Sequence, residues 1–105
     1  METLKTKEQL DSLIKNDNII ALFSADWCPD CRVIEPTLPE IENEFPTYKF
    51  VLIDRDQFIE VCQDYDVFGI PSFIAFKNGQ EAGRFVSKDR KTKEEIIKFI
   101  QGVSA

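Results

Sequence analysis

A pair of cysteines separated by two residues constrains the fold of this chain more than any other feature. Cys28 and Cys31 stand between an apolar run, residues 19–23, and a segment with helical spacing that starts at Cys28. Two cysteines three positions apart on a helix lie one turn apart on the same face, so a disulfide can join them without rearranging the backbone. The spacing therefore predicts a reversible two-electron store at the junction of a strand and a helix.

Cys28 is expected to be the reactive member of this pair. The thiolate is the nucleophilic form of cysteine, and the unpaired N–H groups at a helix N-terminus favour negative charge there. We therefore expect the pKa of Cys28 to lie below that of a free thiol.

A structural zinc site is one alternative for a Cys-x-x-Cys sequence. Zinc takes four ligands, whereas this chain has no histidine and only one further cysteine, Cys62. Cys62 falls in an apolar stripe with helical spacing and is expected to be a core residue. We expect no metal and no cofactor, and redox chemistry is favoured over a pair of reduced core cysteines.

Length and charge limit the remaining function classes. A chain of 105 residues that is 43% hydrophobic predicts one domain over residues 1–105. Its net charge of −6 repels phosphate backbones, so we expect no nucleic-acid partner. We find no apolar run of the kind a signal peptide or a membrane span needs, which predicts a cytoplasmic protein without membrane association. Structural disulfides are rare in that compartment, which favours transient, catalytic oxidation of the cysteine pair.

The apolar pattern predicts alternating helices and strands followed by a hairpin. The expected elements are an edge strand near Leu4, helix 7–16, strand 19–23, a helix from 28 to about 44 bent at Pro36, strand 48–53, a helix from about 58, hairpin strands 72–77 and 80–86, and a last helix opened by a capping box at 92–95. This order predicts an α/β fold with a central mixed sheet of four to five strands flanked by four helices.

Four features in this order resemble the thioredoxin family. They are Trp27-Cys28-Pro29-Asp30-Cys31, the bend at Pro36, Ile70-Pro71-Ser72 before a strand, and the hairpin at Lys77-Asn78-Gly79. The similarity extends over nearly the whole chain, and the Cys-Pro-Asp-Cys variant is similar to that of the small thioredoxin-related proteins. The resemblance implies the thioredoxin fold and an oxidoreductase that works by thiol–disulfide exchange.

The resemblance also implies roles for particular residues. Cys28 would attack a substrate disulfide, and Cys31 would resolve the mixed disulfide. Trp27, Pro29, Ile70 and Pro71 would contact the substrate, with Pro71 in the cis form and the backbone of Ile70 pairing with an extended segment. The implied partners are protein or low-molecular-weight disulfides and a thioredoxin-reductase-like recycling enzyme. A monomer that contributes to electron transport and cell redox homeostasis is expected.

Three positions depart from the usual thioredoxin pattern. Leu22 and Phe50 occupy the positions where thioredoxins usually have a buried acid and its lysine partner, and Asp30 lies between the cysteines. One hypothesis makes Asp30 the proton acceptor for Cys31, and the other makes it a helix charge without a catalytic part.

Two other functions stay open on these residues. One is an adaptor module with weak reductase activity, because the usual proton relay is absent. The other is metal or cluster binding between two chains.

Overall fold

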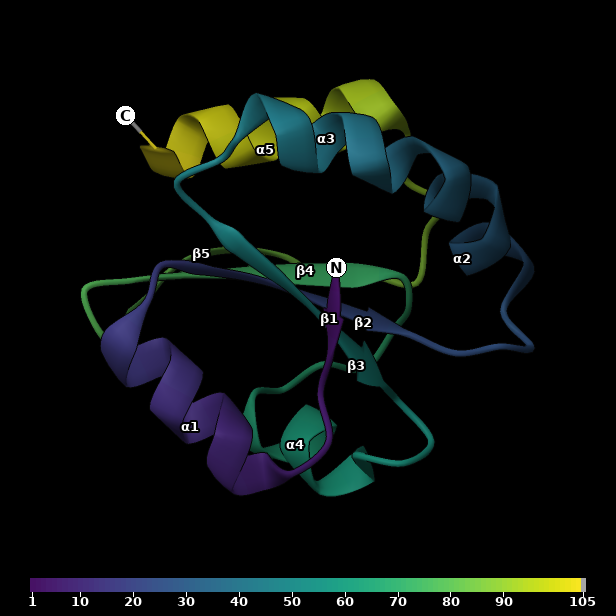
Figure 1. Ribbon diagram of the computed structural model, residues 1–105. Helices are drawn as coiled ribbons and strands as arrows, with labels where there is room; N and C mark the ends of the chain where they lie inside the picture. Colours follow the sequence, from purple (N-terminus) through teal and green to yellow (C-terminus); the bar gives the residue numbers. More distant parts are fainter. Residues whose placement is uncertain (105) are drawn as a thin grey trace.

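The computed structural model describes residues 1–104 and contains a five-stranded mixed sheet with helices on both faces (Figure 1). The elements are β1 (Glu2–Thr3), α1 (Lys7–Asn16), β2 (Ile19–Ser24), α2 (Pro29–Ile34), η1 (Glu35–Thr37), α3 (Leu38–Glu44), β3 (Lys49–Asp54), α4 (Ile59–Asp64), β4 (Ser72–Lys77), β5 (Gln80–Phe85) and α5 (Lys93–Ser104). The strand order is β1-β3-β2-β4-β5. Strands β1, β3 and β2 are parallel, while β4 and β5 add antiparallel pairs. The predicted fold class is confirmed.

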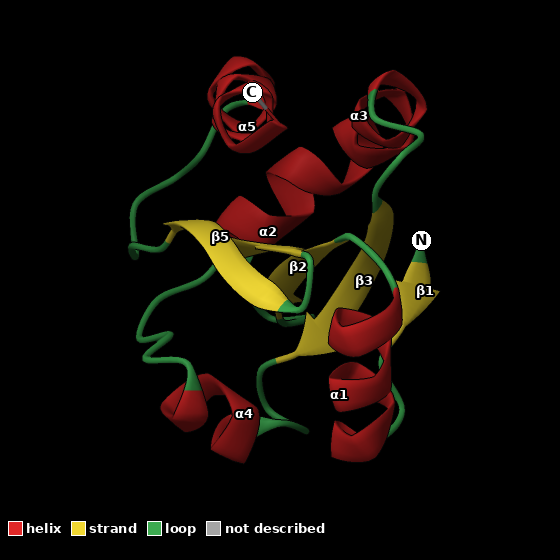
Figure 2. Cartoon of the chain, turned by 90° about the vertical axis from the view of Figure 1, so that its left-hand side faces the viewer, coloured by secondary structure: helices red, strands yellow, loops and turns green. Residues whose placement is uncertain are grey.

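The sheet separates two layers of helices. Helices α1 and α4 cover one face, while α2, α3 and α5 cover the other (Figures 1 and 2). Each layer has its own apolar cluster of buried side chains against the sheet. All six residues of β2 are buried, as expected for a central strand covered on both faces. Within residues 1–104, no helix is long and apolar enough to cross a membrane.

The predicted helix from Cys28 to about residue 44 is bent rather than straight. It consists of α2, a single 3-10 turn (η1) that contains Pro36, and α3. Proline removes a backbone N–H donor and clashes with the preceding turn, which explains the 3-10 turn. The backbone angles of Ile34, Glu35 and Thr37 stay in the right-handed helical region, so the chain bends at Pro36 without leaving the helix. The predicted start is one residue early, because Cys28 is the N-cap.

Local signals in the sequence explain the remaining boundaries. Thr92 and Glu95 form the predicted capping box, in which each side chain accepts from the backbone N–H of the other. Asn78 and Gly79 have φ angles of 55° and 80°, the left-handed values that a two-residue hairpin turn requires. The predicted edge strand lies at Glu2–Thr3, and Leu4 follows it as a buried residue.

Candidate active site

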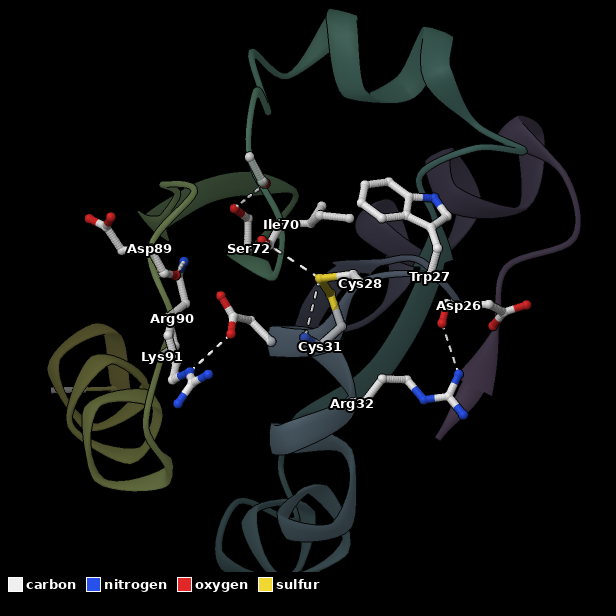
Figure 3. The surroundings of a disulfide bond; sticks show 12 residues. Asp26, Trp27, Cys28, Cys31, Arg32, Ile70, Ser72, Asp89, Arg90 and Lys91 are labelled. Carbon is white, nitrogen blue, oxygen red and sulfur yellow. Dashed lines mark hydrogen bonds and ion pairs between the residues drawn. A yellow bond between two sulfur atoms is a disulfide. The ribbon is translucent and has the colours of Figure 1, made fainter.

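The two cysteines lie beyond the carboxyl end of β2, where the chain enters α2. They are joined in a disulfide, with 5.2 Å between their Cα atoms (Figure 3). The backbone N–H of Cys31 donates to Cys28 Sγ over 3.2 Å. Because an N–H donor favours the charged form of its acceptor, this contact favours the Cys28 thiolate when the pair is reduced.

The segment before β4 packs against the disulfide. The Ile70–Pro71 peptide bond is cis, as the resemblance implied. The carbonyl oxygen of Ile70 lies 3.9 Å from Cys28 Sγ, and its side chain packs against the two cysteines and Ala25. Residues far apart in the sequence therefore meet at the sulfur atoms.

An open groove of about 370 Å³ begins at Cys28. Its lining residues are Trp27, Cys28, Pro29, Asp30, Arg55, Val67, Phe68, Gly69, Ile70 and Lys88. Cys28 is 4% exposed and lines the groove, whereas Cys31 is fully buried and does not. Among the predicted site residues, Pro71 is also buried and does not line the groove. The geometry therefore gives a substrate access to Cys28 first.

Trp27 forms one wall of the groove and is held from the loop after β3. Its indole N–H donates to Asp56 Oδ2 over 2.7 Å. The guanidinium of Arg55 lies 5.8 Å from the Trp27 ring centroid and also binds Asp56. The indole is thus fixed at one edge while 60% of the residue stays exposed.

Asp30, between the two cysteines, makes an ion pair with Arg90. Its Oδ1 accepts a hydrogen bond from Arg90 Nε over 2.9 Å, which makes an ion pair between α2 and the segment before α5. Figure 3 shows Arg90 and Trp27 on either side of the disulfide. Sequence reasoning missed this contact, because the two residues are 60 positions apart.

A buried lysine fixes the loop between β5 and α5 from within. This loop consists of Ser87-Lys88-Asp89-Arg90-Lys91 and is called the 87–91 loop. Lys91 is 1% exposed, and its Nζ donates to Ser87 O and Ser87 Oγ over 3.1 Å and to Asp89 O over 2.9 Å. Burial lowers the pKa of Lys91, while nearby carboxylates, Asp30 among them, oppose that shift. Ser72 Oγ donates to Gly69 O and lies 3.3 Å from Ser87 O, so it joins the loop to the segment before β4.

At Gly69 the segment before β4 passes close to the backbone of the 87–91 loop. A Cβ atom at residue 69 would lie 2.6 Å from backbone atoms of Ser87 and Lys88, which cannot move aside as a flexible side chain could. We expect Gly69→Ala to lower the free energy of unfolding by about 1–3 kcal/mol, as overpacking does. Urea denaturation measures the change.

Gly102 in α5 is the matched control for this substitution. A Cβ atom there meets nothing within 4 Å, so Gly102→Ala should leave stability unchanged or raise it by about 0.5–1 kcal/mol through helix propensity. A Gly69→Ala variant as stable as the wild type would contradict the tight contact.

The topology explains why residues missed by sequence reasoning reach the groove. Arg55 and Asp56 follow β3, and the cysteines follow β2, at the same carboxyl edge of parallel strands. Because β4 runs antiparallel to β2 and β5 antiparallel to β4, β5 also ends at that edge. The turns after β2, β3 and β5 are therefore the places where the sequence could have indicated further residues of the groove.

The two apolar departures from the usual thioredoxin pattern are buried in one cluster. Leu22 is 1% exposed and Phe50 is 3% exposed, and both belong to the apolar cluster between the sheet and α2, α3 and α5. No ionisable pair occupies these positions.

Comparisons with known proteins agree with this fold and cysteine pair. The family model described as Thioredoxin matches residues 2–102. Thioredoxin H4-1 of Oryza sativa subsp. japonica is 31% identical over 102 residues, covering 92% of this chain and 78% of that protein. Thioredoxin-1 of Saccharomyces cerevisiae is 32% identical over 94 residues, covering 89% and 91%.

A solved structure supports the same assignment. The crystal structure of a wild-type poplar thioredoxin h superposes with a TM-score of 0.83 at 26% identity, covering 98% of this chain and 95% of that one. Sequence, fold and the disulfide at the end of β2 therefore agree. This chain belongs to the thioredoxin family, and the chemistry of its Cys28–Cys31 pair is thiol–disulfide exchange.

Proposed function

We propose that this chain reduces protein or low-molecular-weight disulfides through a Cys28/Cys31 dithiol–disulfide cycle. One observation carries the proposal, namely that Cys28 lines the groove while Cys31 is fully buried. A substrate sulfur can therefore reach Cys28 but not Cys31. Cys28 is the nucleophile and Cys31 the resolving cysteine.

The cycle consists of two exchanges. The Cys28 thiolate attacks one sulfur of a substrate disulfide, the substrate S–S bond breaks, and the departing thiolate takes up a proton. Cys31, after losing its proton, attacks Cys28 Sγ and releases the second substrate thiol. Two electrons pass to the substrate, and the chain is left with the Cys28–Cys31 disulfide.

Substrate recognition in this proposal depends on the walls of the groove. Trp27 and Phe68 are the most exposed large apolar side chains in residues 1–104, at 60% and 77%, and both line it. Pro29 and Ile70 line the groove beside the sulfur. An extended substrate segment would pair with the backbone of Ile70, next to the cis bond to Pro71, in the manner of an added strand.

The cellular setting follows from the proposed reaction. A cycle that ends in a disulfide needs a reductant, which we propose is supplied by a thioredoxin-reductase-like enzyme. A cytoplasmic location, a monomeric state and a contribution to redox homeostasis stay predictions of the sequence. Asp30 as the proton acceptor for Cys31 also stays a prediction, and Asp30→Asn would contradict it if disulfide reduction and its pH profile were unchanged.

Replacement of the resolving cysteine tests the proposed roles. We expect Cys31→Ser to retain the first attack, lose turnover in an insulin-reduction assay, and accumulate a mixed disulfide at Cys28 that mass spectrometry detects. Cys62→Ser is the matched control, because Cys62 is buried outside the groove and should leave turnover unchanged. A Cys31→Ser variant that forms no mixed disulfide would contradict Cys28 as nucleophile, and trapping in a lysate would identify the partners.

An adaptor module with weak reductase activity is the second candidate. It is favoured by the buried apolar pair Leu22 and Phe50, which stands where thioredoxins usually have an ionisable pair that could take the Cys31 proton. Slow turnover of the wild type together with efficient trapping by Cys31→Ser would favour this candidate. Metal content of the purified protein tests the third possibility, a site shared between two chains.

A further inference from the structure

The negative charge between the two cysteines raises a problem for the proposed nucleophile. Asp30 lines the groove with Cys28, and a carboxylate close to a sulfur opposes formation of the thiolate. The reaction, however, depends on the thiolate fraction of Cys28. The charges around Asp30 therefore decide how strongly it acts on the sulfur.

Arg90 is placed to cancel that charge. Its Nε lies 2.9 Å from Asp30 Oδ1, and Asp30 is its only ion-pair partner within residues 1–104. The Arg90 side chain is 64% exposed and that of Asp30 is 31% exposed. Exposed pairs of this kind contribute little to stability, so replacing Arg90 should leave the fold intact and allow any effect on Cys28 to be measured.

The backbone that carries Arg90 is held firmly. Within the loop, the buried Lys91 amine donates three hydrogen bonds to Ser87 and Asp89. The backbone of the loop also lies close to Gly69. A lysine that is only 1% exposed is rare, because its charge must be compensated by hydrogen bonds. The 87–91 loop is thus fixed next to the active site rather than left free, and Arg90 extends from it toward Asp30.

Within residues 1–104, none of the other cations around the disulfide makes an ion pair with Asp30, and Arg32 on α2 donates to the carbonyl oxygen of Asp26 over 2.8 Å. Arg55 lines the groove but binds Asp56, which also accepts from Trp27. Lys88 lines the groove and has no ion pair among the described residues. The Lys91 amine donates its hydrogen bonds within the loop, although the charge of Asp30 acts to raise the pKa of Lys91. Arg90 is therefore the cation that acts on Asp30 directly.

We propose that Arg90 is a positioning residue for the exchange reaction, which neutralises Asp30 through their ion pair and thereby keeps the Cys28 thiolate populated at neutral pH. The inference rests on the proposed function, since it matters only if Cys28 is the nucleophile. It connects a loop 60 residues away to the reactivity of the sulfur, and it makes Asp30 compatible with a thiolate beside it.

The pH profile of Cys28 alkylation tests the proposal. The reduced protein is reacted with iodoacetamide at a series of pH values, and Cys28 modification is followed by mass spectrometry in the wild type, Arg90→Gln, Asp30→Asn and the double variant. For Arg90→Gln we expect the midpoint to rise by about half a pH unit, which is about a threefold slower reaction below the midpoint. Arg90→Lys, which keeps the charge, should restore most of the wild-type profile.

The double variant separates action through Asp30 from a direct effect of Arg90. In the Asp30→Asn background the arginine has lost its partner, so adding Arg90→Gln should shift the midpoint much less than it does alone. Lys98→Gln, an equal charge change on an exposed residue of α5, should leave the profile unchanged. Thermal unfolding of each variant confirms that the comparison is between folded proteins.

Two results would overturn the inference. One is an Arg90→Gln profile equal to that of the wild type, and the other is an equal shift with and without Asp30. A wild type whose Cys28 is no more reactive than a free cysteine would instead overturn the proposed function, so the two failures are distinguishable.

Discussion

Cys28→Ser is expected to reduce disulfide turnover to the uncatalysed background. The serine hydroxyl does not ionise near neutral pH and forms no bond equivalent to the mixed disulfide, so both steps of the cycle are lost. Cys31 cannot take over, because it is fully buried and does not line the groove. Insulin reduction with a chemical reductant as electron donor measures the loss.

The third cysteine provides the comparison for this loss. Cys62 is 5% exposed, and burial raises the pKa of its thiol, so less thiolate is present at neutral pH. Cys62→Ser should therefore turn over insulin at the wild-type rate. Because Cys28 is itself nearly buried, circular dichroism must show that Cys28→Ser is folded. Wild-type turnover by a folded Cys28→Ser variant would contradict the assignment of the nucleophile.

Local signals were sufficient to predict most of the fold. Thr92 and Glu95 satisfy each other's backbone donors, and Asn78-Gly79 supplies the left-handed angles of the hairpin turn, so both boundaries depend only on neighbouring residues. The bend at Pro36 was predictable in position because proline lacks the N–H that a straight helix needs. Its division into α2, a 3-10 turn and α3 was not predicted, although the N–H missing at Pro36 explains the turn once it is seen.

The walls of the candidate site depend on contacts between distant segments. The cysteine pair and the cis Ile70–Pro71 bond could be predicted because motifs mark them. Arg90 carries no motif, and it reaches Asp30 only because β5 ends at the same edge of the sheet as β2. Long-range ion pairs of this kind follow from strand order, which periodicity alone leaves undetermined.

The buried apolar environment of Leu22 is testable by substitution. Leu22 lies in the central strand β2 between Leu52 and Phe73, and it is 1% exposed. We expect Leu22→Asp to destabilise the fold by about 3–5 kcal/mol at neutral pH, because its carboxyl group would be buried without a partner. Urea denaturation over a range of pH measures the effect.

The pH dependence separates the cost of charge from the cost of lost packing. Burial would raise the pKa of the new carboxyl above its unfolded value, so the folded variant binds the extra proton and its stability falls as pH rises between the two values. Leu22→Asn, equal in shape but uncharged, should be destabilised without that pH dependence. The double variant Leu22→Asp/Phe50→Lys should lose less stability than the sum of its single variants if the two side chains pair within their shared cluster. A Leu22→Asp variant as stable as Leu22→Asn at every pH would instead mean that water reaches residue 22, and the description of Leu22 as part of a dry apolar cluster would then be incorrect.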